Sequence, residues 1–207
     1  MTRRTAFLTL LVFAPFALFA QPSRDATGRK EFLPYLSLIP EAQRERLGEA
    51  LVDAGGNWRE LAEALKEASE GQRSDVVYLI NEMPHLDRLE MTKATLLEHV
   101  READEARKGM FAKALPESLY REHLLTYRLD EEPCEAWRKP LRERFAPIVS
   151  KARGPLEAAR LVNRWVAKNI KRCESRYFGP EQSPRATLTR KKGTQAEIAS
   201  VDCSGPK

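Results

Sequence analysis

The stretch LEAARLVNRWVAKNI, from Leu156 to Ile170, decides the fold class that we predict for this chain. It follows Gly154-Pro155, and a proline fits the first turn of a helix because its missing N–H would have no partner there. Apolar residues then recur at helical spacing. They are Ala158, Leu161, Val162, Trp165, Val166 and Ile170. An apolar face this broad predicts a helix that packs on a core.

The region before this stretch, residues 36–150, shows helical spacing again and again. Asn57 followed by Glu60 has the form of a capping box. In such a box the Asn57 side chain accepts from a free backbone N–H of the first turn, and the Glu60 side chain reaches back to the N–H of Asn57. Thr92 predicts the start of a longer helix that runs to about Lys108. Support for strands is thin. The sequence therefore predicts a mainly α fold.

The region after this stretch begins with a polar connector, which we expect from about Lys171 to Lys192. The turn Gly193-Thr194-Gln195-Ala196-Glu197 follows it. Thr194 and Glu197 resemble a capping pair, because the hydroxyl and the carboxylate stand three residues apart. A further helix is therefore expected to start at Thr194.

These segments together resemble the approach to the active-site cysteine in bacterial transglutaminase-like proteins. The run L-V-N-R-W-V-A-K-N-I-K resembles the first helix of that domain, and Tyr177–Pro184 is similar to the loop that follows it. Thr187-Leu188 precedes the basic turn, as in those proteins. Upstream, Leu47–Ile148 is similar to the helical extension of several secreted members. The resemblance covers about residues 45–201.

The resemblance implies a helical N-terminal region followed by the first helices of a partial α+β transglutaminase-like (papain-like) domain. The family's chemistry is acyl transfer or hydrolysis on protein and peptide amides through a Cys-His-Asp triad. The place of the cysteine falls at Gly193 or at Gln195, depending on how the turn is aligned. Neither residue is a nucleophile. The chain also stops at Lys207, before a segment that could supply the histidine and the aspartate.

We therefore expect a truncated or inactive transglutaminase-like protein, and we assign no catalytic, cofactor-binding or metal-binding residue. The alternative is a helical envelope module that binds a protein partner or serves as a scaffold without catalysis. A third hypothesis is an active enzyme whose gene was misread near Val201. Each hypothesis makes a protein or a peptide the partner.

The cysteines and histidines do not change this expectation. Cys203 would lie more than two turns into a helix from Thr194, beyond the reach of the helix N-terminus. Any two of the three cysteines could form a disulfide in an oxidising compartment. The cysteines are Cys134, Cys173 and Cys203, and the histidines are His85, His99 and His123. The histidines lack metal-ligand spacing and are expected at the surface or satisfied in the fold.

Two single acids, Glu157 and Glu197, are the remaining candidates for acid/base chemistry. A pair of carboxylates in an apolar setting would favour that chemistry, but each of these acids stands alone. We expect both to be solvated at the surface.

The first residues predict export. Arg3 and Arg4 precede the apolar run Ala6–Phe19, which is short for a membrane span, and Ala20 suits a signal cleavage site. An uncleaved N-terminal anchor is the alternative. We therefore expect a secreted or periplasmic protein without a stable membrane span after cleavage. Our division is a signal peptide over 1–20, a linker over 21–35, a helical region over 36–150 and the partial transglutaminase-like domain over 151–207.

The formal charge of the chain is +5, and it falls to +3 when Arg3 and Arg4 leave with the signal. Basic and acidic residues alternate along much of the chain, which is typical of solvated helix faces. We do not expect nucleic-acid binding.

Overall fold

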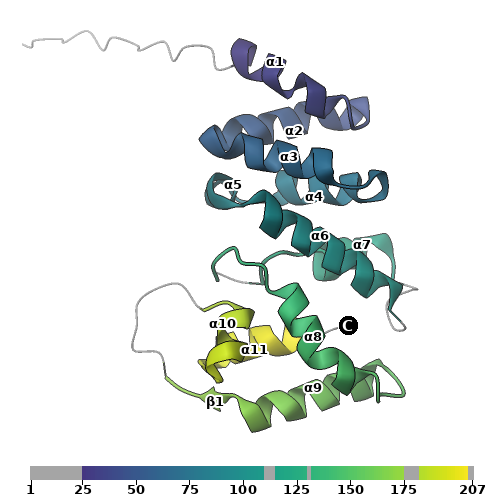
Figure 1. Cartoon of the computed structure of the whole chain (residues 1–207), viewed down its shortest axis with the longest axis vertical. Helices are drawn as coiled ribbons and strands as arrows, with labels where there is room; N and C mark the ends of the chain where they lie inside the picture. Colours follow the sequence, from purple (N-terminus) through teal and green to yellow (C-terminus); the bar gives the residue numbers. More distant parts are fainter. Residues whose placement is uncertain (1–24, 110–114, 130–131, 175–181, 205–207) are drawn as a thin grey trace, which may run out of the picture.

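The computed structural model describes residues 25–109, 115–129, 132–174 and 182–204, with the side chains of 25–29 and 203–204 outside the description. The expected signal segment, 1–20, therefore lies outside the described residues. The described part is mainly α, which confirms the predicted fold class. Its helices are stacked along the long axis of the molecule, from α1 at one end to α9 at the other (Figure 1).

The N-terminal helices come first in the stack. They are α1 (Asp25–Leu36), α2 (Glu41–Asp53), α3 (Trp58–Glu67), α4 (Arg73–Glu82), α5 (His85–Glu90) and α6 (Lys93–Lys108), with the 3-10 turns η1 (Gly55–Asn57) and η2 (Glu70–Gln72) between them. A short α7 (Glu117–Leu119) continues into a π-helix, η3 (Tyr120–Leu124). One apolar core joins α1, α2, α3, α4, α6 and η3, with residues such as Leu51, Leu61 and Leu97 almost completely buried.

The C-terminal elements form a second core. They are α8 (Arg138–Val149), α9 (Pro155–Asn169), α10 (Pro184–Arg190), α11 (Gln195–Ser204) and two short parallel strands, β1 (Lys171–Arg172) and β2 (Lys192–Gly193). Trp137, Phe145 and Val166 lie at the centre of this core. Although α8 falls within the expected helical region 36–150, its buried face belongs to this second core.

Hydrogen bonds join the two cores at one junction. Trp137 Nε1 donates to the carbonyl oxygen of Tyr127 (3.0 Å), and His99 Nε2 donates to that of Glu135 (3.0 Å). The backbone N–H of Lys139, near the start of α8, donates to the Glu98 carboxylate on α6 (2.7 Å). The junction is thus built from specific polar contacts among buried aromatic side chains.

Several sequence predictions of helix ends are confirmed. Thr92 caps α6, since its side chain accepts from the N–H of Thr95, and Pro155 occupies the first turn of α9. Thr194 and Glu197 form the expected capping pair: the N–H of Thr194 donates to the Glu197 carboxylate (2.7 Å), and the N–H of Glu197 donates to the Thr194 hydroxyl (3.3 Å).

The predicted capping box at Asn57 was wrong. The Asn57 amide instead donates to the carbonyl oxygens of Arg88 and Met91, both at 2.9 Å, at the end of α5. Glu60 accepts from the N–H of Lys93 (2.7 Å) at the start of α6. Both side chains therefore satisfy the ends of other helices, which become neighbours only in the tertiary structure.

Two segments expected to lack regular structure are helical. Helix α1 occupies most of the expected linker 21–35, and its Phe32 is buried against Trp58. Helix α10 lies within the expected connector, where Ser183 caps it and Thr187 is completely buried. Tertiary packing stabilises both short helices, whose sequences carry weak helical patterns.

The length and hydropathy of each helix show whether it could span a membrane. Among the helices in the described ranges, none is both long enough and apolar enough to cross a bilayer.

Candidate functional site

The turn between β2 and α11 is where the resemblance places the cysteine. Gly193 is buried there, and a Cβ atom added to it would lie 3.0 Å from Thr187 Cγ2 and 3.2 Å from Glu197 Cβ. A side chain at this position would therefore require its neighbours to shift. Gln195, the first residue of α11, is exposed.

Glu197 organises this turn. Its carboxylate accepts from the N–H of Thr194, from the N–H of Gln182 (2.9 Å) and from the Gln182 side-chain amide (3.1 Å). The expectation of a solvated surface acid was therefore wrong for Glu197, which is half-buried. Glu157 is exposed, as expected, and accepts from the N–H of Arg153 (2.8 Å) at the start of α9.

The cysteines do not form a reactive site in the described structure. Cys134 and Cys173 are both half-buried free thiols, and burial raises the pKa of Cys134 to about 12. The backbone of Cys173 is part of the β1–β2 pairing, since its N–H donates to the Gly193 carbonyl oxygen (2.9 Å). The side chain of Cys203 lies outside the described residues.

Asp87, Glu90 and Cys134 form the one group of possible metal ligands found among the described residues, with ligand atoms within 4.8 Å of one another. The carboxylate of Asp87 already accepts from the Tyr127 hydroxyl (2.6 Å) and from the Arg128 guanidinium. Because Arg128 supplies the positive charge that a metal ion would bring, the group is a structural ion network.

The three histidines are separated. His85 lies at the surface with Nδ1 2.9 Å from Asp53 Oδ1, and His123 is exposed beside Glu122. His99 is fully buried at the junction of the two cores.

A groove of about 1140 Å³ lies where α1, α2 and α5 meet, toward the α1 end of the molecule (Figure 1). Leu33 and Leu36 come from α1, Val52 from α2 and Leu89 from α5. Leu33 and Leu89 keep 59% and 44% of their surface exposed, whereas Leu36, Leu47 and Leu51 of the same helices are buried. The groove is therefore apolar and open to solvent.

Backbone geometry helps to shape the groove. Gly55 joins α2 to α3 with a φ of 54°, in the left-handed region that glycine adopts without strain. A Cβ atom there would meet Leu89 Cδ2 at 3.6 Å. Gly48 on α2 lies opposite Leu36, so its missing side chain leaves space between α1 and α2.

Charged residues surround the apolar part of the groove. Asp53 pairs with Arg88 (2.7 Å) and His85, and the hydrogen bond from Arg88, followed by that from His85, lowers the pKa of Asp53. Glu45 and Glu49 lie one turn apart on the exposed side of α2, and neither has an ion-pair partner among the described residues. Arg44 also lines the groove and donates to the carbonyl oxygen of Ile39, so it and the two glutamates leave a net charge of −1 beside the leucines.

A second, smaller hollow of about 540 Å³ adjoins the groove, sharing His85 and Leu89 with it. Leu86, 73% exposed, lies in this hollow. The exposed apolar surface therefore continues around α5.

Sequence reasoning missed this groove. Its clearest sequence signal is the set of leucines that do not fit the buried faces of their helices, namely Leu33, Leu86 and Leu89. Their exposure becomes evident only when α1 is recognised as a helix and placed against α2.

Comparison of the chain with protein-family models, with curated proteins and with solved structures found no match.

Proposed function

We propose that this protein is a helical module that binds a protein partner in the cell envelope, and that it has no catalytic activity. The partner is a basic amphipathic helix. The observation that carries the proposal is the groove between α1, α2 and α5, where exposed leucines lie beside Glu45 and Glu49, which form no ion pair within the described ranges. Helices that bind in grooves insert apolar residues at helical spacing, and charges at the rim select the partner.

Charge complementarity favours a basic partner. Lysine or arginine residues next to the apolar positions of the bound helix would neutralise Glu45 and Glu49, whereas an acidic helix would be repelled. The leucines supply the apolar contact area. Their exposure is informative because contiguous exposed apolar surface marks interaction sites.

We also propose that residues 151–207 correspond to the opening helices of a transglutaminase-like domain that has lost thiol chemistry. Gly193 and Glu197 support the loss of thiol chemistry, because Thr187 and Glu197 occupy the space that a side chain at Gly193 would need and the Glu197 carboxylate is held by backbone N–H groups. Export to the envelope is part of the proposal too, and it rests on the basic and apolar N-terminal sequence.

The binding proposal is tested with a synthetic helical peptide of about 18 residues that has leucines on one face and lysines beside them. Fluorescence anisotropy measures its affinity for the full chain. We expect binding that weakens at least about tenfold in Leu33→Ser/Leu89→Ser and in Glu45→Lys/Glu49→Lys. A matched peptide with glutamates in place of the lysines should prefer the Lys variant.

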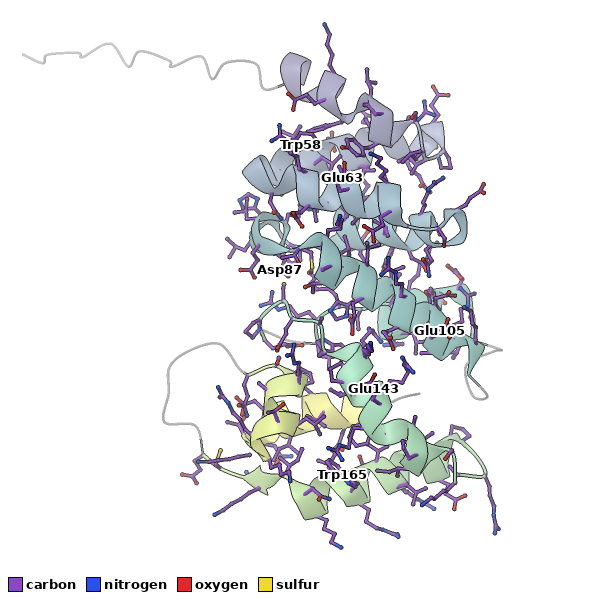
Figure 2. The ribbon with its side chains drawn as sticks, viewed as in Figure 1. Trp58, Glu63, Asp87, Glu105, Glu143 and Trp165 are labelled. Carbon is purple, nitrogen blue, oxygen red and sulfur yellow. The ribbon has the colours of Figure 1, made fainter. Side chains whose placement is uncertain are left out.

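Two control variants keep the groove intact. Leu119→Ser changes a similarly exposed leucine outside the groove, and Glu122→Lys/Glu143→Lys changes two exposed acids away from it, of which Glu143 lies on α8 (Figure 2). Both controls should bind like the unmodified chain. Equal affinity of all variants for the lysine peptide, or equal binding of the two peptides, would refute the groove as the binding site.

A further inference from the structure

The formal charge of the chain is strongly divided between its two parts. Residues 36–150 contain 17 basic and 23 acidic residues, a formal charge of −6. Residues 151–207 contain 13 basic and 5 acidic residues, a formal charge of +8. The interleaving of basic and acidic residues seen along most of the chain is thus weaker in its C-terminal part. A charge asymmetry of this size points to a polyanionic partner for the basic part.

The basic residues of α9 form one row. Arg160, Arg164 and Lys168 stand four residues apart, so they lie along the same side of the helix, and all three are exposed. The opposite side carries Val162 and Val166, which are buried in the second core. Blue-tipped side chains project from α9 away from the rest of the molecule (Figure 2).

The row continues at the end of α9. There β1 and β2 bring Lys171 opposite Lys192, and Arg172 is exposed next to them. We call the six residues Arg160, Arg164, Lys168, Lys171, Arg172 and Lys192 the cationic face. Helix α9 forms the end of the molecule opposite α1, so this face is separate from the groove (Figure 1).

The six residues of the cationic face have no ion pair within the described ranges, although basic residues of the N-terminal helices commonly do, as in Arg46–Glu82 and Arg101–Glu67. One exposed acid of α9, Glu157, lies three residues before Arg160, but its carboxylate accepts from the backbone N–H of Arg153. Positive charges four residues apart on a helix repel one another. An external anionic surface would relieve that repulsion, and a large one would engage the whole face at once.

An apolar residue completes the row. Leu156 lies four residues before Arg160, at the start of α9, and is 64% exposed. A leucine in line with basic residues suits a bilayer interface, where the leucine enters the apolar boundary and the cations meet lipid phosphates. A nucleic acid would leave this leucine against its charged backbone. Moreover, the large exposed apolar residues in the described ranges are all leucines, so no exposed aromatic ring is there to stack on bases.

We propose that the cationic face, with Leu156, adsorbs to membrane surfaces that contain anionic lipid. Binding is peripheral: the basic residues contact lipid headgroup phosphates, and Leu156 enters the interface. This surface is distinct from the groove, so a membrane-bound molecule could still hold a protein partner at its opposite end.

The test is co-sedimentation of the full chain with vesicles of phosphatidylcholine alone or with about 30% phosphatidylglycerol. We expect a large increase in binding with the anionic lipid and its loss at about 0.5 M salt. At about one kcal/mol for each basic residue near such a surface, the variant Arg160→Gln/Arg164→Gln/Lys168→Gln should bind the anionic vesicles about 100-fold more weakly. Binding to the neutral vesicles measures any contribution of the apolar N-terminal segment and should be the same in both chains.

The matched control is Arg46→Gln/Lys66→Gln/Lys139→Gln, which removes the same charge from exposed residues of the N-terminal helices and α8. It should retain most of the anionic increment, which is the increase in binding caused by the anionic lipid. Thermal melts followed by circular dichroism check that both triple variants fold. The single variant Leu156→Ser changes no charge and so tests the apolar contact by itself. We expect it to weaken binding several-fold.

Three results would overturn the proposal. One is an anionic increment that the α9 variant retains, and another is an increment that the control variant loses equally. The third is tight, salt-sensitive binding to a DNA duplex of about 20 base pairs, reduced only in the α9 variant, together with no anionic increment on vesicles. That result would reassign the face to nucleic acid.

Discussion

The carboxylate of Glu197 accepts a hydrogen bond from the backbone N–H of Gln182 at 2.9 Å and so ties the start of α11 to the segment before α10. It also accepts from the N–H of Thr194 and from the Gln182 side chain. Three donors on one half-buried carboxylate make Glu197 the organising residue of the turn between β2 and α11. The residue that the sequence predicts to be a solvated acid is therefore a structural one.

Replacing this carboxylate should cost stability. We expect Glu197→Ala to lower the free energy of unfolding by about 2 kcal/mol, because it leaves the amides of Thr194 and Gln182 without their acceptor. Urea titration followed by circular dichroism measures the loss. Glu157→Ala is the control, since Glu157 is exposed and accepts from a single N–H, and it should cost less than about 1 kcal/mol. Equal losses would contradict the role of Glu197.

Introducing a cysteine tests the geometry of the turn between β2 and α11. We expect Gly193→Cys to lower the free energy of unfolding by about 1–3 kcal/mol, because its Cβ would lie 3.0 Å from Thr187 Cγ2. Gln195→Cys should preserve stability and react quickly with iodoacetamide, because the N-terminus of α11 favours the thiolate. Mass spectrometry of digested protein gives the labelling rate at each cysteine.

Cys134 serves as the internal reference in that experiment. Its burial, which raises its pKa to about 12, should make it the slower thiol in the folded protein. Neither cysteine variant should hydrolyse a peptide amide. If Gly193→Cys is fully stable, or if the thiol introduced by Gln195→Cys labels no faster than Cys134, the turn is arranged differently.

The buried pair Tyr120 and Asp75 should respond differently from Tyr127 and Asp87. The Tyr120 hydroxyl donates to Asp75 (2.6 Å), whose pKa is raised mainly by burial. Tyr120→Phe leaves that carboxylate desolvated and should cost about 2 kcal/mol at pH 7. Its deficit should shrink as the pH falls, because protonation removes the charge of Asp75, which folding disfavours.

Tyr127→Phe provides the comparison in the same urea titrations. It removes an equivalent hydroxyl, but Asp87 keeps the guanidinium of Arg128. We expect a smaller loss of stability that changes little with pH. Identical behaviour of the two variants would mean that Arg128 does not compensate Asp87.

His99 should make folding sensitive to mild acid. Burial, and secondarily the charge of Arg138, lowers its pKa to about 3, whereas the unfolded chain has the ordinary value near 6.5. Between these two pKa values the unfolded state binds a proton that the folded state does not. The stability that neutral His99 contributes is therefore complete above about pH 6.5 and is lost as the pH falls. The free energy of unfolding falls by about 2 kcal/mol between pH 6.5 and pH 5 for this reason.

The measurement is urea unfolding of His99→Gln and of the unmodified chain at pH 7 and pH 5. The variant should lose less stability between the two values, because glutamine does not titrate. His123→Gln changes an exposed histidine and should retain the full pH dependence. If His99→Gln and the unmodified chain show the same slope, His99 does not remain neutral in the fold.

The sequence predicted those features of the structure that depend on residues close together in the chain. The capping pair of Thr194 and Glu197, the cap at Thr92 and the start of α9 at Pro155 depend on residues within one turn of each other, and each was predicted. The mainly α fold class follows from apolar spacing, which reports which side of each helix is buried. The resemblance to a transglutaminase-like domain directed attention to Gly193, but spacing alone could not say how that residue packs.

Contacts between distant segments were beyond the sequence. Asn57 and Glu60 have the pattern of a local cap, yet their partners are Arg88, Met91 and Lys93, which adjoin them only after α3 packs beside α5 and α6. Helix α1 looked like a linker because its own pattern is weak.

By itself, the sequence determined that the chain is mainly α and where several of its helices begin, including the start of α11 after Gly193. The tertiary structure alone decided that Leu33 and Leu89 border one groove, that Glu197 is half-buried and that the basic row of α9 forms an end of the molecule. The reason is physical: helix formation is governed by hydrogen bonds and side chains a few residues apart, whereas grooves and charged surfaces arise from residues that only packing brings together.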